Sequence, residues 1–346
     1  MTAKTMLFSM SAFQALTILS LLFFSSPISI QAQNGPERNE QVVFGVNGHP
    51  LVAGSYSEPL ERQISQLKAL GLRAYRININ PTNMMTPEKM DRLTQLIDLA
   101  RRQDVRILPT IVIKADPSTI EDQAYSAAKS MTYQLAKRFD KTLHVWELGN
   151  EYDLYCVEPG ANGMDPASYD TEKYNIVRAL IRGMSDGLQE GSPTALHIVE
   201  TSQNGKNPDS GFLERLIRNG IKFDITSYHY YTQTGQFRIA ENGENALEIL
   251  HQEFHKPIWI TEFDKAAHDG AGPNAVEQGE ALETALSEIA RDSRKYDIAE
   301  AYIYELLDQP ELLSVKPAQA EFGILKANGD PTAASIAVKT FLLAYY

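Results

Sequence analysis

The sequence predicts a single (β/α)₈ barrel, the TIM-barrel fold, and three observations support this. Eight short apolar runs, rich in β-branched and aromatic residues, alternate with amphipathic helical stretches. Each run ends in polar or small residues, as strands do at the carboxyl-terminal mouth of such a barrel. No Gly/Ser-rich linker or shift in composition divides residues 42–346, so one domain is the simplest account.

The eight runs are taken as strands in chain order. They cover residues 42–47, 72–79, 106–113, 143–150, 196–200, 223–229, 257–262 and 299–305. The same alternation also permits a doubly wound open sheet, which usually carries a Gly-rich phosphate turn after its first strand. Here the first strand ends Gly45-Val46-Asn47-Gly48-His49, which lacks that fingerprint and favours the barrel.

Helix signals fill the intervals between the strands. Thr86-Pro87-Glu88 reads as an N-cap, an N1 proline and an acidic first turn. The first helix, around residues 63–70, should stop at Gly71, a good residue for a helix end. Gly329-Asp330-Pro331 is expected to open the last helix.

The first 32 residues are predicted to be a signal peptide. Lys4 gives a slight positive start, residues 6–24 are apolar, and Ala32 ends a plausible cleavage site. Residues 33–41 form a short polar lead to the barrel domain, residues 42–346. The mature protein is then secreted or periplasmic, with no stable membrane association. The alternative is an uncleaved membrane anchor, because the apolar stretch is long for a signal peptide.

Composition narrows the function classes. The chain of 346 residues is 43% hydrophobic and 22% charged, which is typical of a globular protein, and its formal net charge is -12. So acidic a chain does not bind nucleic acid by general electrostatics. Cys156 is the only cysteine, which excludes an intramolecular disulfide. The sequence does not indicate an oligomeric state.

Two glutamates lie at the ends of apolar strands. One predicted strand runs into Gly149-Asn150-Glu151 and another into Ile260-Thr261-Glu262. An acidic residue that leaves a buried strand is costly unless it is paired or used. A helix cap or a buried ion pair would explain either glutamate alone. Two of them on one rim, three strands apart, indicate chemistry instead.

These strand ends resemble clan A of the glycoside hydrolases, the group that contains families 5 and 39. The resemblance implies that Glu151 is the acid/base, that Asn150 binds the sugar 2-hydroxyl and that Glu262 is the nucleophile. Arg76 resembles the clan's strand-two arginine beside the nucleophile. His229-Tyr230-Tyr231 fits the His-x-Tyr pattern whose tyrosine touches the nucleophile.

The resemblance covers nearly the whole mature chain, but it has two departures. Family 5 usually has a His near the end of strand three, where this chain has Ile113-Lys114-Ala115. It usually has a Trp at the end of strand eight, where this chain has Tyr302-Ile303-Tyr304-Glu305. We expect both changes to remodel the sugar site and to leave the catalytic pair intact.

The resemblance implies that the protein cleaves β-glycosidic bonds of a poly- or oligosaccharide. Two carboxyls about 5–5.5 Å apart can protonate the leaving oxygen and attack the anomeric carbon, with retention of configuration. Their mutual repulsion, about 3 kcal/mol at an effective dielectric of about 20, should keep Glu151 protonated near neutrality while Glu262 ionises. Once Glu262 forms a glycosyl ester, Glu151 can act as the base for water.

Other residues at the strand ends have weaker assignments. Glu147, deeper on the strand of Glu151, is expected to form an interior ion pair. Glu305 could contact sugar or serve the structure. Trp259, of opposite strand parity to Glu262, is expected to pack against helices. Candidate sugar platforms are Tyr152, Tyr155, Tyr231 and Tyr304, and the long connection from Tyr152 to about Asp170 is expected to shape specificity or to be a surface insertion.

No cofactor or metal is expected. A metal-dependent hydrolase would need several His or Asp residues converging at strand ends. Of the seven histidines, only His229, and His49 less clearly, reach the rim. Two further functions stay open, a transglycosylase that uses the same two glutamates and a non-catalytic carbohydrate-binding barrel.

Overall fold

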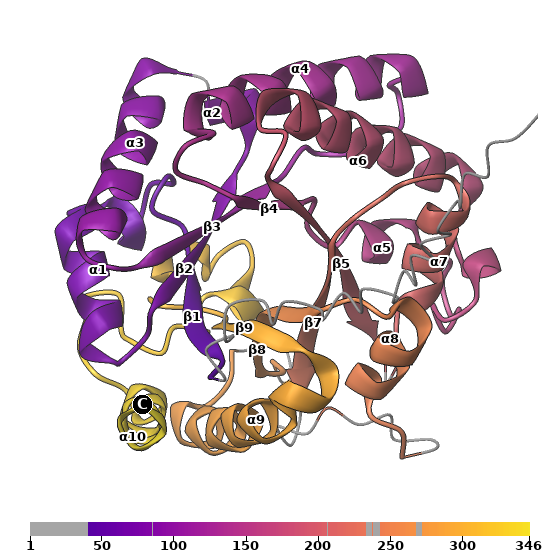
Figure 1. Cartoon of the computed structure of the whole chain (residues 1–346). Helices are drawn as coiled ribbons and strands as arrows, with labels where there is room; N and C mark the ends of the chain where they lie inside the picture. Colours follow the sequence, from indigo (N-terminus) through magenta and orange to yellow (C-terminus); the bar gives the residue numbers. More distant parts are fainter. Residues whose placement is uncertain (1–40, 85, 206, 233–236, 238–242, 268–271) are drawn as a thin grey trace, which may run out of the picture. The chain divides into compact units, whose positions relative to one another are not determined.

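The computed structural model describes residues 41–84, 86–205, 207–232, 237, 243–267 and 272–346. Within this part of the chain, eight parallel strands form a closed ring and helices surround it (Figure 1). The predicted barrel is confirmed. The predicted signal peptide, residues 1–32, lies outside the described residues and stays a prediction. None of the described helices is both long and apolar enough to cross a membrane.

All eight predicted strands are present, each within a few residues of its predicted bounds. They are β1 (Val43–Gly48), β2 (Ala74–Ile79), β3 (Arg106–Ile111), β4 (Val145–Leu148), β5 (Leu196–Asn204), β7 (Ile225–Thr232), β8 (Ile258–Lys265) and β9 (Ile298–Ile303). Parallel pairing runs from β1 through β5, then to β7, β8 and β9, and β9 pairs with β1 to close the ring. The two-residue β6 (Asn207–Pro208) pairs antiparallel with the end of β5.

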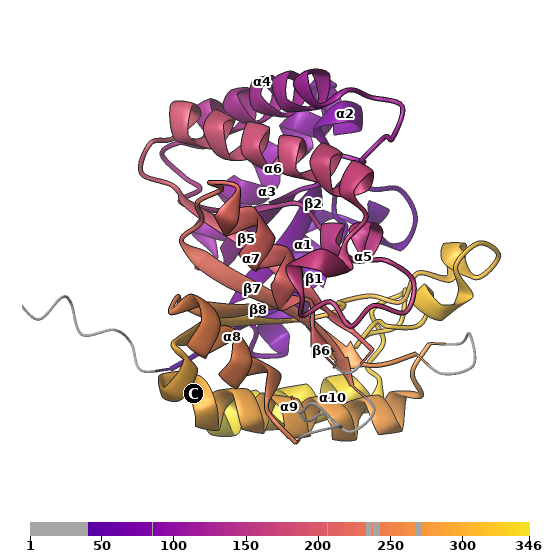
Figure 2. The ribbon, with the colours of Figure 1, turned by 90° about the vertical axis from the view of Figure 1, so that its right-hand side faces the viewer.

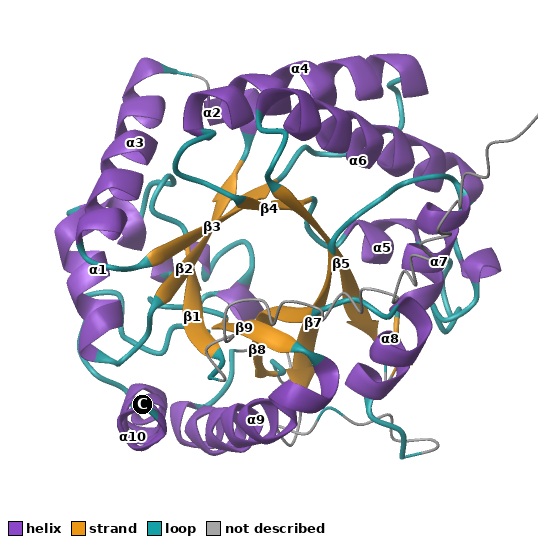
Figure 3. Ribbon diagram, viewed as in Figure 1, coloured by secondary structure: helices purple, strands orange, loops and turns teal. Residues whose placement is uncertain are grey.

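Helices cover the outside of this ring (Figure 3). They are α1 (Leu60–Ala69), α2 (Pro81–Met84), α3 (Pro87–Arg102), α4 (Glu121–Phe139), α5 (Tyr152–Cys156), α6 (Thr171–Gly191), α7 (Ser210–Arg218), α8 (Ala246–Phe254), α9 (Ala275–Tyr296) and α10 (Ala333–Tyr345). The predicted N1 proline of α3 is Pro87. The last helix begins later than predicted, because Thr332 is its N-cap and forms a capping box with Ser335 in the first turn.

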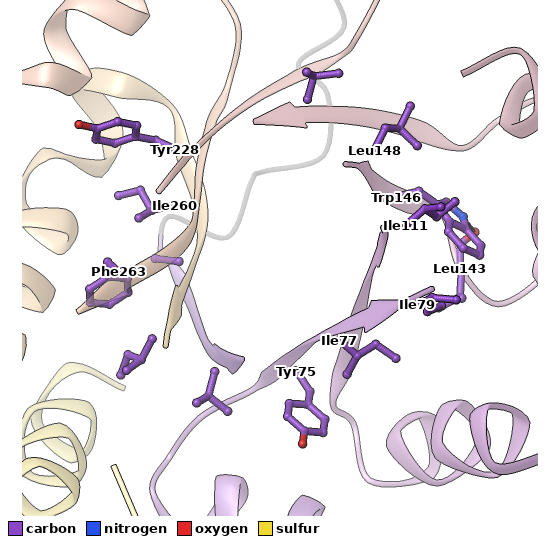
Figure 4. Packing of buried hydrophobic residues seen from close by; sticks show 14 of the residues in the cluster. Tyr75, Ile77, Ile79, Ile111, Leu143, Trp146, Leu148, Tyr228, Ile260 and Phe263 are labelled. Atoms are coloured by element: carbon purple, nitrogen blue, oxygen red, sulfur yellow. Dashed lines mark hydrogen bonds between the residues drawn. The ribbon is translucent and has the colours of Figure 1, made fainter. Parts of the chain in front are cut away.

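The main core lies between the strands and the helices. Side chains alternate along β2, so that Tyr75, Ile77 and Ile79 are buried on its outer side (Figure 4). Arg76, between Tyr75 and Ile77, therefore points into the barrel. This alternation brings polar residues into the interior, where the site is built.

Inside the barrel, a second and smaller apolar cluster occupies the amino-terminal end. It contains Ala74, Leu108, Ile198, Ile225, Trp259 and Tyr302. The prediction that Trp259 packs against helices is therefore wrong. Ser227 pairs with Trp259 but His229 pairs with Glu262, so β8 carries one extra residue in this interval. This bulge breaks the strand's parity and lets Trp259 and Glu262 both face inward.

Candidate active site

Glu262 lies on β8 and is almost fully buried, at 4% exposure. Arg76 Nη1 donates to its Oε1 at 2.6 Å, and the Tyr231 hydroxyl donates to its Oε2 at 2.6 Å. Both contacts fix the orientation of the carboxylate. The neighbours that the sequence assigned to Glu262 are therefore those that the structure brings to it.

Glu151 follows β4 and faces the same space. Its backbone is left-handed, with φ 52°, and Gly149 two residues earlier has φ 101°. A Cβ on Gly149 would lie 2.6 Å from the Tyr152 ring, so this tight turn requires glycine. The Glu151 side chain is 36% exposed, in contrast to that of Glu262.

Arg76 lies at the centre of the site and is 1% exposed. Its guanidinium donates to four side chains, and its Nη2 also lies 3.4 Å from His229 Nε2. In addition to Glu262, its guanidinium donates to Glu147 Oε2 at 2.6 Å and to Asn47 Oδ1 at 2.7 Å. It also donates to Asn150 Oδ1 at 2.9 Å, which orients that amide beside Glu151. Glu147 thus forms the interior ion pair expected of it, and it is fully buried.

His229 stands among three carboxylates. Its Nδ1 lies 3.0 Å from Glu200 Oε2, 3.5 Å from Glu151 Oε1 and 3.7 Å from Glu262 Oε2. Its Nε2 lies 3.0 Å from the hydroxyl of Thr261 on β8. Burial alone would lower the pKa of His229, but the Glu200 and Glu262 carboxylates raise it to about 10. The ring is therefore a cation at neutral pH.

This cation changes the expected charge of Glu151. Burial raises the pKa of Glu151, but the hydrogen bond and charge of His229 outweigh it and hold the pKa below its usual value. The expectation that Glu151 is protonated near neutrality is thus wrong for the ligand-free site. The proton is held instead within the His229–Glu200 pair: burial raises the pKa of Glu200 well above its usual range, and the charge of His229 opposes that shift.

A pocket of about 690 Å³ opens over the two glutamates. Figure 2 shows α5 and the segment after β9, in yellow, at the same end of the barrel. The residues that line the pocket are His49, Val52, Asn78, Asn150, Glu151, Tyr231, Glu262, Ala266, Ala267, Tyr304, Gln309, Leu312, Val315, Lys316, Gln319 and Phe322. Glu311 joins the connections that follow β9 and β1, because it accepts from the Ser55 amide at 2.8 Å and from the Ser55 hydroxyl at 2.9 Å.

Most of the predicted site residues meet at this pocket. Glu151, Glu262, Asn150, Tyr231 and Tyr304 line it, while Arg76 and His229 lie buried beneath it.

Three assignments differ. Glu305 is fully buried and is not among the lining residues, because its oxygens contact Tyr56, Gln309 and His49. The structure thus gives Glu305 the structural role and not the sugar contact. Tyr152 is buried against Ile113, so it cannot be a sugar platform. None of the described lining residues comes from 152–170.

Sequence reasoning missed Glu200 and the segment around residues 309–319. Glu200 did carry a signal, since it is an acidic residue inside an apolar strand, and the predicted strand ended there. The segment after β9 carried none, because its part in the pocket depends on where the chain turns back over the mouth.

Glu151, Glu262 and His229 each offer a ligand atom, and the three atoms lie within 4.8 Å of one another. Such a triplet has the spacing of a metal site. A metal, however, needs an unprotonated imidazole nitrogen, and the carboxylates around His229 keep it protonated at neutral pH. Arg76 also supplies a positive charge directly to Glu262. The arrangement therefore fits paired carboxylates better than metal ligands.

Known structures share this barrel. A family 39 glycoside hydrolase from Bacteroides cellulosilyticus WH2 matches with a TM-score of 0.60 and 17% identity, over 88% of this chain and 64% of its own. This chain thus spans less than two thirds of that structure's length. GH5_18 from Streptomyces cattleya, in complex with GlcNAc, matches with a TM-score of 0.63 and 15% identity, over 88% of this chain and 80% of its own. A β-glucosidase from Thermotoga maritima, in complex with deoxynojirimycin, matches with a TM-score of 0.64 and 12% identity, over 90% of this chain and 98% of its own. At these identities the likeness is one of fold.

Sequence comparison gives the family. No curated protein sequence matches at a significant level. The family model for cellulase, glycosyl hydrolase family 5, matches residues 35–297, which is most of the chain. The His and Trp that the chain lacks at strands three and eight therefore do not place it outside this family. The chain belongs to glycosyl hydrolase family 5 and is a glycosidase.

Proposed function

We propose that this protein is a retaining glycosidase that cleaves β-glycosidic bonds of a poly- or oligosaccharide, with Glu151 as acid/base and Glu262 as nucleophile. One observation carries the proposal: a carboxylate oxygen of Glu151 lies within 4.8 Å of one of Glu262. Retaining enzymes hold their two carboxyls about 5–5.5 Å apart, whereas inverting enzymes need about 6.5–9.5 Å to admit a water between them. The spacing leaves no room for that water.

In the first step, Glu262 attacks the anomeric carbon while Glu151 protonates the departing oxygen. Arg76 and Tyr231 donate hydrogen bonds to the two oxygens of Glu262 and fix its direction of attack. Asn150, oriented by Arg76, is placed to bind the sugar 2-hydroxyl. The products of this step are a glycosyl ester on Glu262 and a free leaving group.

Glu151 must acquire its proton before that step. In the open site it is 36% exposed and paired with cationic His229, and both conditions favour its ionised form. A bound sugar covers Glu151 and excludes water, which raises the pKa of a carboxyl. Once the ester has removed the charge of Glu262, Glu151 can take a proton from the incoming water.

The stereochemistry of the product tests this mechanism. A panel of aryl β-glycosides and β-linked polysaccharides first identifies a sugar that the protein turns over. Proton NMR during the first minutes of hydrolysis should then show the β-anomer as the initial product. Initial release of the α-anomer would contradict the retaining mechanism. Transfer products in place of free reducing sugar would indicate a transglycosylase, and absence of any turnover a binding barrel.

Export to the periplasm or the medium is also proposed, because residues 1–32 have the composition of a signal peptide. Amino-terminal sequencing of the protein from the extracellular or periplasmic fraction should begin after Ala32. An intact terminus on a membrane-bound protein would support the anchor instead.

A further inference from the structure

Glu200 is a buried carboxylate beside the active site to which the proposed mechanism gives no role. It lies on β5 at 3% exposure and contacts both Glu151 and His229. Burying a carboxylate is costly unless other groups compensate for it. Among the described residues, Glu200 forms its ion pair with His229 and not with a lysine or an arginine.

The first contact of Glu200 is with the backbone of the acid/base residue. Its Oε1 accepts the Glu151 amide N–H at 2.6 Å. Glu151 has left-handed dihedrals, φ 52° and ψ 38°, which a residue with a side chain adopts only when its surroundings hold it there. The hydrogen bond from that amide to the Glu200 carboxyl is one such restraint.

The second contact reaches the side chain of Glu151 indirectly. Glu200 Oε2 lies 3.0 Å from His229 Nδ1, the atom that also faces Glu151 Oε1 at 3.5 Å. One carboxylate therefore restrains both the backbone of Glu151 and the ring against which its carboxyl lies. Neither Glu200 contact is with Glu262, which accepts hydrogen bonds from Arg76 and Tyr231 and lies farther from His229 Nδ1, at 3.7 Å.

Glu300 shows what a purely structural glutamate of this barrel looks like. It lies on β9 at 4% exposure and is paired with Arg106 Nη1 at 2.6 Å. It is at the opposite end of the barrel, beside Tyr302, and contacts neither catalytic glutamate. Its burial matches that of Glu200, so it serves as a matched control.

We propose that Glu200 is a positioning residue for proton donation, and that it acts through the Glu151 backbone and the His229 ring. The inference rests on the proposed role of Glu151 as acid/base. It predicts a selective defect: loss of Glu200 should impair reactions that need the leaving oxygen to be protonated, and it should spare those that do not.

Two aryl glycosides of the sugar that the protein turns over provide the test. The 2,4-dinitrophenyl glycoside releases a stable phenolate without acid assistance, whereas the 4-methylphenyl glycoside needs a proton. For Glu200→Ala, we expect kcat/KM on the 4-methylphenyl glycoside to fall by about 10- to 100-fold, part of the 10²–10⁴-fold that general acid catalysis contributes. On the dinitrophenyl glycoside it should fall by less than about 3-fold.

Glu151→Ala and Glu300→Gln complete the comparison. Glu151→Ala should show the same split between the two substrates, and a larger one. Glu300→Gln should change both substrates alike and by little. Equal losses on both substrates for Glu200→Ala, or no loss, would overturn the role of Glu200 if Glu151→Ala shows the split. Absence of the split in Glu151→Ala would instead refute the proposed acid/base.

Glu200→Gln keeps the test decisive if Glu200→Ala does not fold. Its amide oxygen can still accept the Glu151 N–H, but it has no charge to hold His229. We expect a smaller split, of about 3- to 10-fold, since one of the two restraints remains. Equal effects on the two substrates would overturn the proposal.

Discussion

The two ends of the barrel each carry an arginine paired with a glutamate from another strand, and the two pairs differ in their exposure to solvent. At the carboxyl-terminal end, Arg76 is 1% exposed and contacts both Glu147 and Glu262 at 2.6 Å. At the amino-terminal end, Arg106 contacts Glu300 at the same 2.6 Å, but its side chain is 61% exposed. The ion pairs thus have the same length, but one arginine is buried and the other is exposed to solvent.

The interiors behind these pairs differ in the same way. The amino-terminal end is filled with apolar side chains, among them Trp259, Tyr302 and Leu108, which stabilise the fold by burial. The carboxyl-terminal end holds charges that are costly to bury and are stable only while they are paired. The apolar amino-terminal end thus stabilises the fold, while the charges required for chemistry are concentrated at the carboxyl-terminal end.

The largest expected difference between the two ends is in catalysis. Glu262→Gln keeps the shape of the side chain but removes the nucleophile, so kcat/KM should fall on the order of 10⁴-fold. Glu300→Gln is the equivalent change at the other end and should leave kcat/KM within about 3-fold of the wild type, because Glu300 contacts Arg106 and Tyr302 far from the two catalytic glutamates. Steady-state kinetics on one aryl glycoside compares them. Similar rates for the two variants would remove Glu262 from the mechanism.

The next largest effect is on stability. Arg76→Met should lower the free energy of unfolding by about 3–5 kcal/mol, because it leaves Glu147 buried without its cation. Urea unfolding at neutral pH, followed by circular dichroism, measures the change. A loss under about 1 kcal/mol would mean that water or a proton compensates Glu147 at no cost.

The pH dependence of stability should have opposite signs at the two ends. Burial opposes ionisation of Glu147, but Arg76, His229 and nearby hydroxyls hold its pKa below the usual value. The contribution of Glu147 to the free energy of unfolding is present above the pKa of a glutamate in the unfolded chain, about 4.3. It is lost as the pH falls through the lower pKa of the folded state. Glu147→Gln should therefore flatten the acid side of the stability profile.

Glu300 should behave in the reverse manner. Burial raises its pKa, although Tyr302 and Arg106 oppose the shift. The contribution of Glu300 to the free energy of unfolding is present below its pKa in the unfolded chain. It is lost as the pH rises through its higher pKa in the folded protein. Unfolding free energies of Glu300→Gln from pH 3 to 7 should decline less with rising pH than those of the wild type. Parallel profiles for the two variants would contradict the comparison.

The smallest effect belongs to Arg106. Its pair with Glu300 is mostly exposed, so Arg106→Met should cost about 0–1 kcal/mol and respond to added salt. The same urea unfolding measures it beside Arg76→Met. A cost equal to that of Arg76→Met would show that exposure does not separate the two pairs.

The sequence predicted the features that depend on local pattern. Strand alternation located all eight barrel strands, because a continuous strand preserves its periodicity. The resemblance to clan A, and not the strand pattern, named Arg76 and Tyr231 as the neighbours of Glu262.

The failures have one physical origin, which is that local periodicity does not report irregular backbone or long-range packing. Trp259 was misplaced because a bulge in β8 adds a residue between it and Glu262. Glu305 was placed at the rim, but Tyr56 from the far end of the chain covers it. The charge of Glu151 depends on His229 and Glu200, which lie on other strands.

The central claim, that Glu262 is the nucleophile of a retaining glycosidase, is tested most directly by trapping its ester. A 2-deoxy-2-fluoro glycoside with a dinitrophenyl leaving group forms the glycosyl-enzyme faster than water can release it. Intact mass spectrometry should show one added fluorosugar, and peptide mapping should place it on Glu262. Attachment to any other residue, or turnover of this substrate with no adduct, would contradict the account.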